Sequence, residues 1–243
     1  MIAFHGDSNL KARYVDRLKA HEVADEIIHG TYWENGKGCA VGCTIHSSNH
    51  GAYETELGIP MILARLEDRI FEGMSNGNSK EFPMRFLNAI PVGADLSSVW
   101  YQFAHWLLVD EKDGVLRFAK TDRTKKAIQD VADLYARAGR GEKVATKEWQ
   151  SARQYAAAAT AAAAAYADAA AAYAAAAAPA VDAAAAYAAA DAAAAAPAVD
   201  AAAAAAAAAY ADAAAAARRK AYKRQADKLI ELLMAAPIPE GVT

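Results

Sequence analysis

The sequence predicts a mainly α-helical protein in which a helical globular domain precedes alanine-rich helices packed as a hairpin or a small bundle. Two observations carry this prediction. The run from Tyr155 to Ala217 is almost entirely alanine, the strongest helix former, because alanine loses no side-chain entropy in a helix. Upstream of this run, apolar residues recur at the spacing of amphipathic helices, between breaks that contain Gly or Pro.

The composition of the 243 residues changes once along the chain. Every Trp, His and Cys lies before residue 150, in sequence that otherwise resembles an ordinary globular domain. We therefore expect a helical globular domain over residues 1–141, an alanine-rich helical region over 146–234 and a terminal tail over 235–243. Because alanine offers almost no chemistry, a functional site is expected before residue 146.

Capping and turn residues predict where the first helices begin and end. Asp7 or Ser8 is expected to begin a helix whose apolar stripe extends to Ile28 and which ends at Gly30. Pro60 suits the first turn of a second helix, which Gly73 closes. The apolar side of this second helix consists of Ile62, Leu63, Leu66 and Ile70.

Three more helices are expected in the globular domain. Residues 83–90 predict a short helix, and Asp95 is expected to cap a helix with an aromatic-rich buried face. A further helix is expected to begin at Thr121 or Asp122 and to end near Gly139. The buried face of the helix after Asp95 is expected to contain Val99, Trp100, Phe103, Trp106 and Leu107.

One short β-hairpin is also predicted. The pair Asp113-Gly114 is typical of a turn, and it lies between the apolar segments Leu107–Val109 and Val115–Phe118. These two segments are therefore expected to be the strands of the hairpin.

The alanine-rich region contains an internal repeat. Pro179-Ala180-Val181-Asp182 recurs as Pro197-Ala198-Val199-Asp200, and Pro followed by Asp favours a helix start. Helices are therefore expected over about 147–177, 180–195 and 198–234, and the alternative is one long helix kinked at both prolines. The last helix is expected to pack on the globular domain through Leu229, Ile230, Leu232 and Leu233.

Charge and cysteine content exclude several classes of protein. With a formal net charge of −3, the chain has no global attraction to nucleic acid or to a membrane surface. Each Asp in the alanine tract would cost about 2.5–3.5 kcal/mol at the centre of a bilayer, so no membrane span is expected. Only two Cys are present, and no signal peptide is recognisable at Met1–Asp7, so a reducing, cytoplasmic location is expected.

The segment Trp33–Thr44 contains the first candidate site, because three Gly surround Lys37 there. Backbone N–H groups of a Gly-rich turn at a helix start bind phosphate oxygens, and Lys adds a point charge. The spacing differs from a Walker A loop, and the alternative is a tight turn that needs glycine for its backbone angles. The residues expected at the ligand are Trp33, Lys37, Gly38, Gly42, Cys43, Thr44, His46 and His50.

A zinc site is the second candidate. Two Cys and two His share one face of this segment if it is helical; they are Cys39, Cys43, His46 and His50. A single straight helix cannot surround an ion tetrahedrally, so a bent segment would offer three ligands and His5, His21 or Glu56 the fourth. The alternative is two buried Cys and two surface His.

A reactive cysteine is a further alternative in the same segment. Cys39 or Cys43 would be a nucleophile if a helix start and Lys37 lowered its pKa and a His acted as base. Uniformly slow labelling of both thiols would exclude this alternative.

Three segments resemble a group of uncharacterised bacterial and phage proteins. They are Tyr32–Thr44, with its Gly-Cys-Ala-Val-Gly-Cys-Thr loop, Tyr53–Pro60 and Ala89–Ala94. The resemblance covers about residues 1–140, and proteins of this group often end in Ala/Tyr/Asp-rich tails. It implies no established activity, so it assigns no catalytic residue. The phage association implies a counter-defence protein that sequesters a nucleotide signal.

The leading functional prediction is a binding protein, rather than an enzyme, for a small phosphate-bearing, nucleotide-like molecule. Lys37 and backbone amides would contact the anion, Trp33 would stack on a base, and no cofactor is expected. The alternatives are a structural or interaction protein assembled through the alanine-rich helices and a Cys-dependent enzyme or zinc-site protein. A homo-oligomer is expected, because each alanine buries little area and the tail needs a further surface to pack on.

Overall fold

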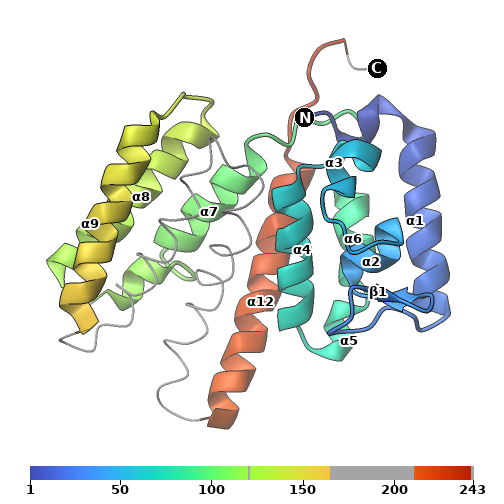
Figure 1. The fold of residues 1–243 in the computed structure, drawn as a ribbon, viewed down its shortest axis with the longest axis horizontal. Helices are drawn as coiled ribbons and strands as arrows, with labels where there is room; N and C mark the ends of the chain where they lie inside the picture. The colour runs from blue at the N-terminus through green and yellow to red at the C-terminus, as the bar shows by residue number, and fades with distance from the viewer. Residues whose placement is uncertain (120, 165–210, 242–243) are drawn as a thin grey trace. The chain divides into compact units, whose positions relative to one another are not determined.

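The computed structural model describes residues 1–119, 121–164 and 211–241, and it is mainly helical, as the sequence predicts (Figure 1). The chain forms two compact units, which we describe separately. The first unit comprises Met1–Val99 and Tyr222–Thr243, and the second comprises Trp100–Ala221. The predicted boundary after residue 141 lies inside the second unit, and the predicted division into domains stays a prediction.

The first unit begins with a 3-10 turn, η1 (Ala3–Gly6), and helix α1 (Ser8–Val23). Asp7 caps α1, as predicted, because its side chain accepts the N–H of Asn9. The expectation that this helix continues to Gly30 is wrong. Asp25 adopts a φ of 55°, in the left-handed region, which ends the helix. Val23 is consequently 81 % exposed.

After α1 the chain forms a two-stranded hairpin and a short helix. Strand β1 (Trp33–Glu34) pairs with β2 (Lys37–Gly38). Asn35 and Gly36 form the turn with φ angles of 52° and 83°, which suit Asn-Gly, the pair that favours two-residue hairpin turns. Helix α2 (Ala40–Ile45) begins two residues after β2, and all of its residues are buried.

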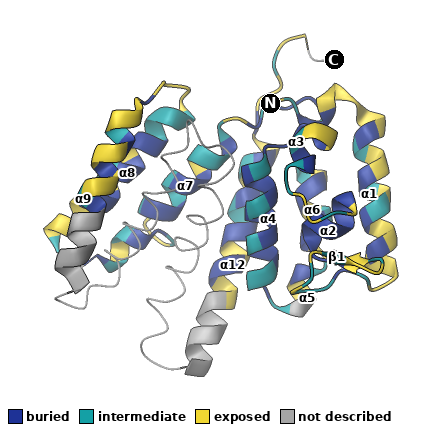
Figure 2. Ribbon diagram, viewed as in Figure 1, coloured by how far each residue is buried: buried dark blue, intermediate teal, exposed yellow. Residues whose placement is uncertain are grey.

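Four helices complete the amino-terminal part of this unit: α3 (Ala52–Leu57), α4 (Met61–Gly73), α5 (Asn76–Ser79) and α6 (Phe82–Ala89). The helix predicted between Pro60 and Gly73 is confirmed, and its predicted apolar side is buried. No residue of α4 is exposed, and α4 lies beside α12 (Figure 2). The helix predicted over residues 83–90 corresponds to α6.

Helix α12 (Ala211–Met234) completes the core of the first unit with its carboxyl-terminal part. Leu229 and Leu233 are fully buried, as predicted. The ring of Tyr222 lies 2.2 Å from where a Cβ on Gly73 would be, so only glycine permits this contact. Arg85 of α6 forms an ion pair of 2.8 Å with Asp227 of α12.

The second unit contains helices α7 (Val99–Val109), α8 (Asp122–Gly139) and α9 (Thr146–Ala164), with a 3-10 turn, η2 (Val115–Phe118). The Tyr135 ring of α8 lies 6.1 Å from Trp100 of α7 and 5.4 Å from Trp149 of α9. Aromatic contacts thus join the three helices. The start of α8 after Thr121 and its end at Gly139 agree with the sequence.

The predicted hairpin around Asp113-Gly114 is wrong. Leu107–Val109 belongs to α7, and Val115–Phe118 forms η2. The Asp110 carboxylate accepts the N–H groups of Lys112 and Asp113, and the Asp110 carbonyl accepts the N–H of Gly114. This side-chain capping builds a loop at the end of α7 in place of a hairpin turn.

The predicted tail helices are described only in part. Helix α9 begins at Thr146 and α12 ends at Met234, close to the expected limits. Both predicted breaks, Pro179 and Pro197, lie outside the described residues. None of the helices in the described part of the chain is long and apolar enough to cross a lipid bilayer.

Candidate functional site

The hairpin, α2 and the end of α1 meet in the first unit, and this junction contains most of the predicted site residues (Figure 1). The segment after α1 pairs with β2, because the N–H of Gly38 donates to the Glu26 carbonyl and the N–H of Ile28 donates to the Gly38 carbonyl. These bonds fix Glu26 beside the start of α2.

Two glycines of the predicted anion loop are required for packing. A Cβ on Gly38 would lie 2.1 Å from the Tyr32 carbonyl oxygen, and a Cβ on Gly42 would lie 1.5 Å from the same atom. The hairpin therefore approaches α2 so closely that no larger residue fits at either position. This close approach, rather than a phosphate cradle, explains these two glycines.

The backbone donors of the loop are used inside the protein. The N–H of Gly38 donates to Glu26, and the N–H of Cys39 donates to the carbonyl of Thr31. The N–H of Gly42 donates to the Cys39 thiol at 3.5 Å. Side chains, and not these amides, therefore remain as the groups for an anion to contact.

Two histidines and a glutamate form a continuous hydrogen-bonded chain at this junction. Glu26 Oε2 lies 2.6 Å from His21 Nδ1, and His21 Nε2 lies 2.8 Å from His46 Nε2. His21 is 8 % exposed, whereas His46 is exposed at the carboxyl end of α2. The chain thus runs from a half-buried carboxylate to an imidazole at the surface.

Trp33 and Arg17 complete this arrangement, which we call the histidine cluster (Arg17, His21, Glu26, Trp33 and His46). The Trp33 ring stacks on His46 with centroids 4.4 Å apart and an interplanar angle of 12°. Arg17 of α1 donates to the Thr44 carbonyl at 2.8 Å, which fixes its guanidinium close to the end of α2. The imidazole of His46 is therefore oriented by one ring and one hydrogen bond.

The surroundings of His46 are more basic than acidic. Burial, then the positive charge of Arg17 and then that of His21 lower the pKa of His46 from its ordinary value, and only Glu26 opposes them. Lowering this pKa favours the neutral imidazole at neutral pH. The cluster therefore combines a neutral imidazole with a permanent cation, which favours an anionic ligand.

A second imidazole–carboxylate pair lies further along the chain, between His50 and α4, and we call its surroundings the inner face. His50 Nε2 lies 3.6 Å from Asp68 Oδ2 of α4, and the ring of Tyr32 meets His50 edge-on. The carboxylate of Asp68 also lies close enough to the Cys39 thiol to raise the pKa of that thiol. His50 thus faces Asp68, and no hydrogen bond joins it to the Cys39 thiol in the described part of the chain, as a base acting on that thiol would need.

Both cysteines are buried and unoxidised. Burial and the neighbouring carboxylate of Asp68 raise the pKa of Cys39, and burial raises the pKa of Cys43 to about 12. A nucleophilic cysteine needs the opposite shift, so the setting does not support the thiolate alternative. In the described part of the chain, no three His, Cys, Asp or Glu side chains are gathered closely enough to hold a metal ion.

The remaining predicted residues have separate settings. Lys37 is exposed on the hairpin, whereas Thr44 is buried and donates to the Ala40 carbonyl at 2.8 Å. Of the predicted ligand-binding set, the structure brings together Trp33 and His46. Sequence reasoning gave His21 no role beyond that of a fourth zinc ligand and did not single out Arg17 or Glu26. No spacing motif connects these three residues to His46.

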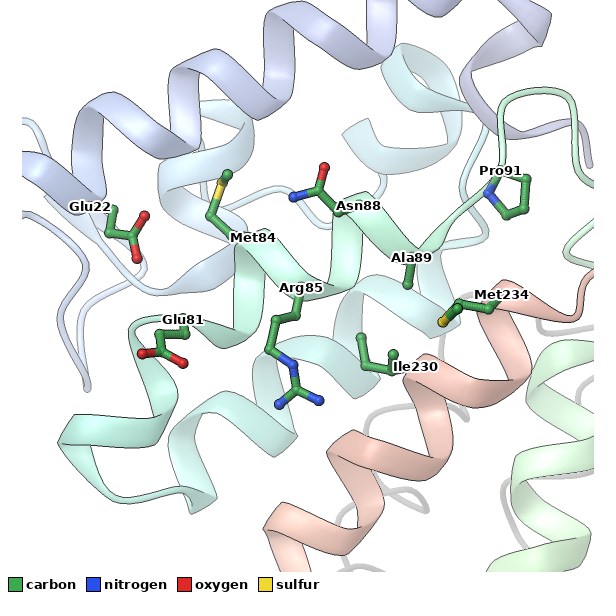
Figure 3. Close-up of a pocket in the computed structure, with 9 residues that line it drawn as sticks. All are labelled: Glu22, Glu81, Met84, Arg85, Asn88, Ala89, Pro91, Ile230 and Met234. Atoms are coloured by element: carbon green, nitrogen blue, oxygen red, sulfur yellow. The ribbon is translucent and has the colours of Figure 1, made fainter.

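A second concave surface lies between α6 and the end of α12, with a volume of about 600 Å³ (Figure 3). Met84, Ala89, Pro91, Ile230 and Met234 give it an apolar lining, and Glu22 and Glu81 add negative charge. Its one lining cation, Arg85, is paired with Asp227. This charge pattern suits an apolar molecule better than a phosphate.

Comparison with known proteins adds no functional assignment. The chain matches no protein-family model, no curated protein and no solved structure.

Proposed function

We propose that the protein binds a small phosphate-bearing ligand at the histidine cluster. The observation that carries this proposal is the exposed imidazole of His46, which is held by Trp33 and His21 beside the guanidinium of Arg17. Imidazole and guanidinium groups donate hydrogen bonds to phosphate oxygens, and the fork of Arg suits them particularly well.

Arg17 retains donors for such a ligand. Its Nη1 donates to the Thr44 carbonyl, and its guanidinium lies 4.7 Å from the centre of the Tyr14 ring. A guanidinium has five N–H donors, and the described residues occupy one of them. The bond to Thr44 positions the group, so little side-chain entropy is lost when a phosphate binds.

Trp33 supports a ligand that also carries a base or another flat ring. Its indole is half-buried on the hairpin and already stacks on one ring, that of His46. Aromatic side chains stack on any base without sequence preference. A nucleotide is therefore the ligand class that uses both the cationic and the aromatic parts of the cluster.

Calorimetric titration with adenosine 5′-monophosphate tests this proposal, with adenosine as the ligand that lacks the phosphate. We expect binding of the monophosphate, a loss of about tenfold or more in affinity for Arg17→Gln and for His46→Asn, and weaker binding of adenosine. His105→Gln changes a histidine of α7 outside the cluster and should bind like the wild type. Equal binding of adenosine and its monophosphate would contradict the proposal.

The other predicted functions find less support. An assembly built by the alanine-rich helices depends mainly on residues outside the described ranges, so it stays a prediction, as does a homo-oligomer. A zinc site formed by Cys39, Cys43, His46 and His50 also stays a prediction. It finds little support, because His46 and His50 have different partners and both cysteines are buried.

A further inference from the structure

The hydrogen-bonded chain of the histidine cluster ends at a single ring nitrogen. His46 Nε2 faces His21, whereas His46 Nδ1 has no hydrogen-bond partner among the described residues. The imidazole is exposed, and its ring plane is set by the stacked Trp33. An oriented imidazole with one open nitrogen is the arrangement that proton transfer to or from a bound molecule requires.

The partners of His21 determine where the protons lie. An ionised carboxylate only accepts hydrogen bonds, so His21 Nδ1 carries a proton and donates it to Glu26. A neutral His21 then accepts at Nε2, and His46 donates from its own Nε2. In this state the lone pair of His46 lies on the open Nδ1.

A second state differs from the first by one proton. When His46 Nδ1 takes up a proton, the proton on His46 Nε2 moves across 2.8 Å to His21 Nε2. The positive charge then resides on His21, which lies 2.6 Å from the Glu26 carboxylate. The carboxylate stabilises that charge and holds the tautomer, the role that an orienting acid has in hydrolytic triads.

We propose that His46 is the general base of a phosphodiester-hydrolysing site, with His21 and Glu26 as positioning residues. This inference rests on the proposed binding of a phosphate-bearing ligand at the same cluster. It goes beyond binding, because it assigns a reaction and a substrate class. Arg17 is the group placed to neutralise the charge that develops on the phosphoryl oxygens.

The reaction transfers one water molecule across a P–O bond. His46 Nδ1 accepts a proton from water, and the proton on His46 Nε2 passes to His21 Nε2. The water oxygen forms a bond to phosphorus, while the bond from phosphorus to the leaving oxygen breaks and that oxygen keeps the electron pair. Return of the proton through His46 to the leaving oxygen restores the cluster, so a phosphodiester and water yield a phosphomonoester and an alcohol.

The charged groups that face His46 set the pH at which this base works. They are Arg17 and His21 on α1 and Glu26 on the segment after α1. Burial, and after it the positive charge of Arg17, lower the pKa of His46 from its ordinary value of 6.5, so that the imidazole is neutral at neutral pH. Hydrolysis should therefore rise with pH below about 6.5 and become independent of pH above it.

Hydrolysis of bis(4-nitrophenyl) phosphate by the full-length protein tests the reaction directly. We expect 4-nitrophenolate release above the buffer rate, a loss of about 100-fold or more for His46→Asn and a loss of about tenfold or more for Glu26→Gln. Asn suits position 46 because His46 has a φ of 53°, which Asn adopts more readily than most residues. His105→Gln should retain the wild-type rate, and absence of release by the wild type would overturn the proposal.

Acylation of histidines by diethyl pyrocarbonate tests the relay without a substrate. The reagent attacks neutral imidazole nitrogens, so His46 should react faster than His105 at pH 7, and Glu26→Gln should slow His46 alone. If His46 were acylated at the same rate in Glu26→Gln as in the wild type, the proposed proton transfer from His46 to His21 would be overturned. Binding of adenosine 5′-monophosphate without hydrolysis of the diester would refute this inference and leave the proposed function intact, whereas absence of that binding would refute the proposed function.

Discussion

The first unit contains two imidazole–carboxylate pairs, His21 with Glu26 and His50 with Asp68. The difference between their surroundings explains why only the first pair belongs to a candidate site. Glu26 and His21 continue outward to His46, which is exposed. Asp68 and His50 instead close inward on the buried Cys39 thiol. The residue types in the two pairs are nearly the same. The first pair is a candidate site because it leads to an imidazole at the surface, whereas the second pair lies against the core and has a structural role.

The largest loss of stability is expected from a substitution at Gly42, because it separates the hairpin from α2 and so disturbs both imidazole–carboxylate pairs. Gly42→Ala places a Cβ 1.5 Å from the Tyr32 carbonyl oxygen, so the hairpin must move away from α2. We expect a loss of about 3 kcal/mol or more in the free energy of unfolding, measured by urea denaturation. Gly77→Ala is the matched control, because nothing lies within 4 Å of its added Cβ, and it should change stability by less than about 0.5 kcal/mol.

The next largest loss of stability is expected from removing a buried hydrogen bond between Tyr53 and Glu67, on the inner face. The Tyr53 hydroxyl donates to Glu67 Oε2 at 2.8 Å, and both residues are fully buried. Tyr53→Phe should cost about 1–3 kcal/mol of unfolding free energy, because it leaves a buried carboxyl group unpaired. Affinity for adenosine 5′-monophosphate should not change, and a parallel loss of affinity would show that the two faces are coupled. Tyr32→Phe, at a side chain that is 53 % exposed, is the control.

The packing around Cys43, whose thiol faces the Glu26 and Gly38 carbonyls, should weaken at alkaline pH. Burial raises the pKa of Cys43 from 9.0 to about 12, so the unfolded chain loses this proton at lower pH than the folded protein. The contribution is therefore fully present below about pH 9 and is lost as the pH rises toward 12. Unfolding free energies measured at pH 8, 9 and 10 should decline less steeply in Cys43→Ala than in the wild type. An equal decline in both would contradict the assigned cause.

The smallest effect is expected at the outer edge of the hairpin. Lys37 is exposed, and its amine makes no hydrogen bond or ion pair with any described residue. Lys37→Ala should change the unfolding free energy by less than about 0.5 kcal/mol. It should weaken binding of adenosine 5′-monophosphate less than Arg17→Gln does. A larger loss from Lys37→Ala would move the anion site from the histidine cluster to the hairpin turn predicted from the sequence.

Local sequence signals predicted the helices well, because they act within a few residues. Pro60 and Gly73 bracket α4, and Thr121 caps α8 through its side chain. The same local reasoning failed where a competing local signal was overlooked. Asn35-Gly36 builds a hairpin that periodicity does not reveal, and Asp110 captures backbone donors that a strand pair would have used.

The candidate site was predictable only in part. Trp33 and His46 were named because they lie near the glycines, but those glycines accommodate the Tyr32 carbonyl. The chain from Glu26 through His21 to His46 depends on the packing of α1 against α2, and the two histidines are 25 positions apart in the sequence. Long-range packing of this kind leaves no periodic pattern in a single sequence.

The return of α12 to the first unit has a consequence for biosynthesis. Residues 100–221 are translated between the two parts of this unit, which takes on the order of ten seconds at about 5–20 residues per second. During that interval the buried side of α4 lacks Tyr222, and the core that Leu229 and Leu233 fill stays open. The nascent first unit therefore exposes this apolar surface until the part of α12 that contains Tyr222, Leu229 and Leu233 has been made, and its core closes only then.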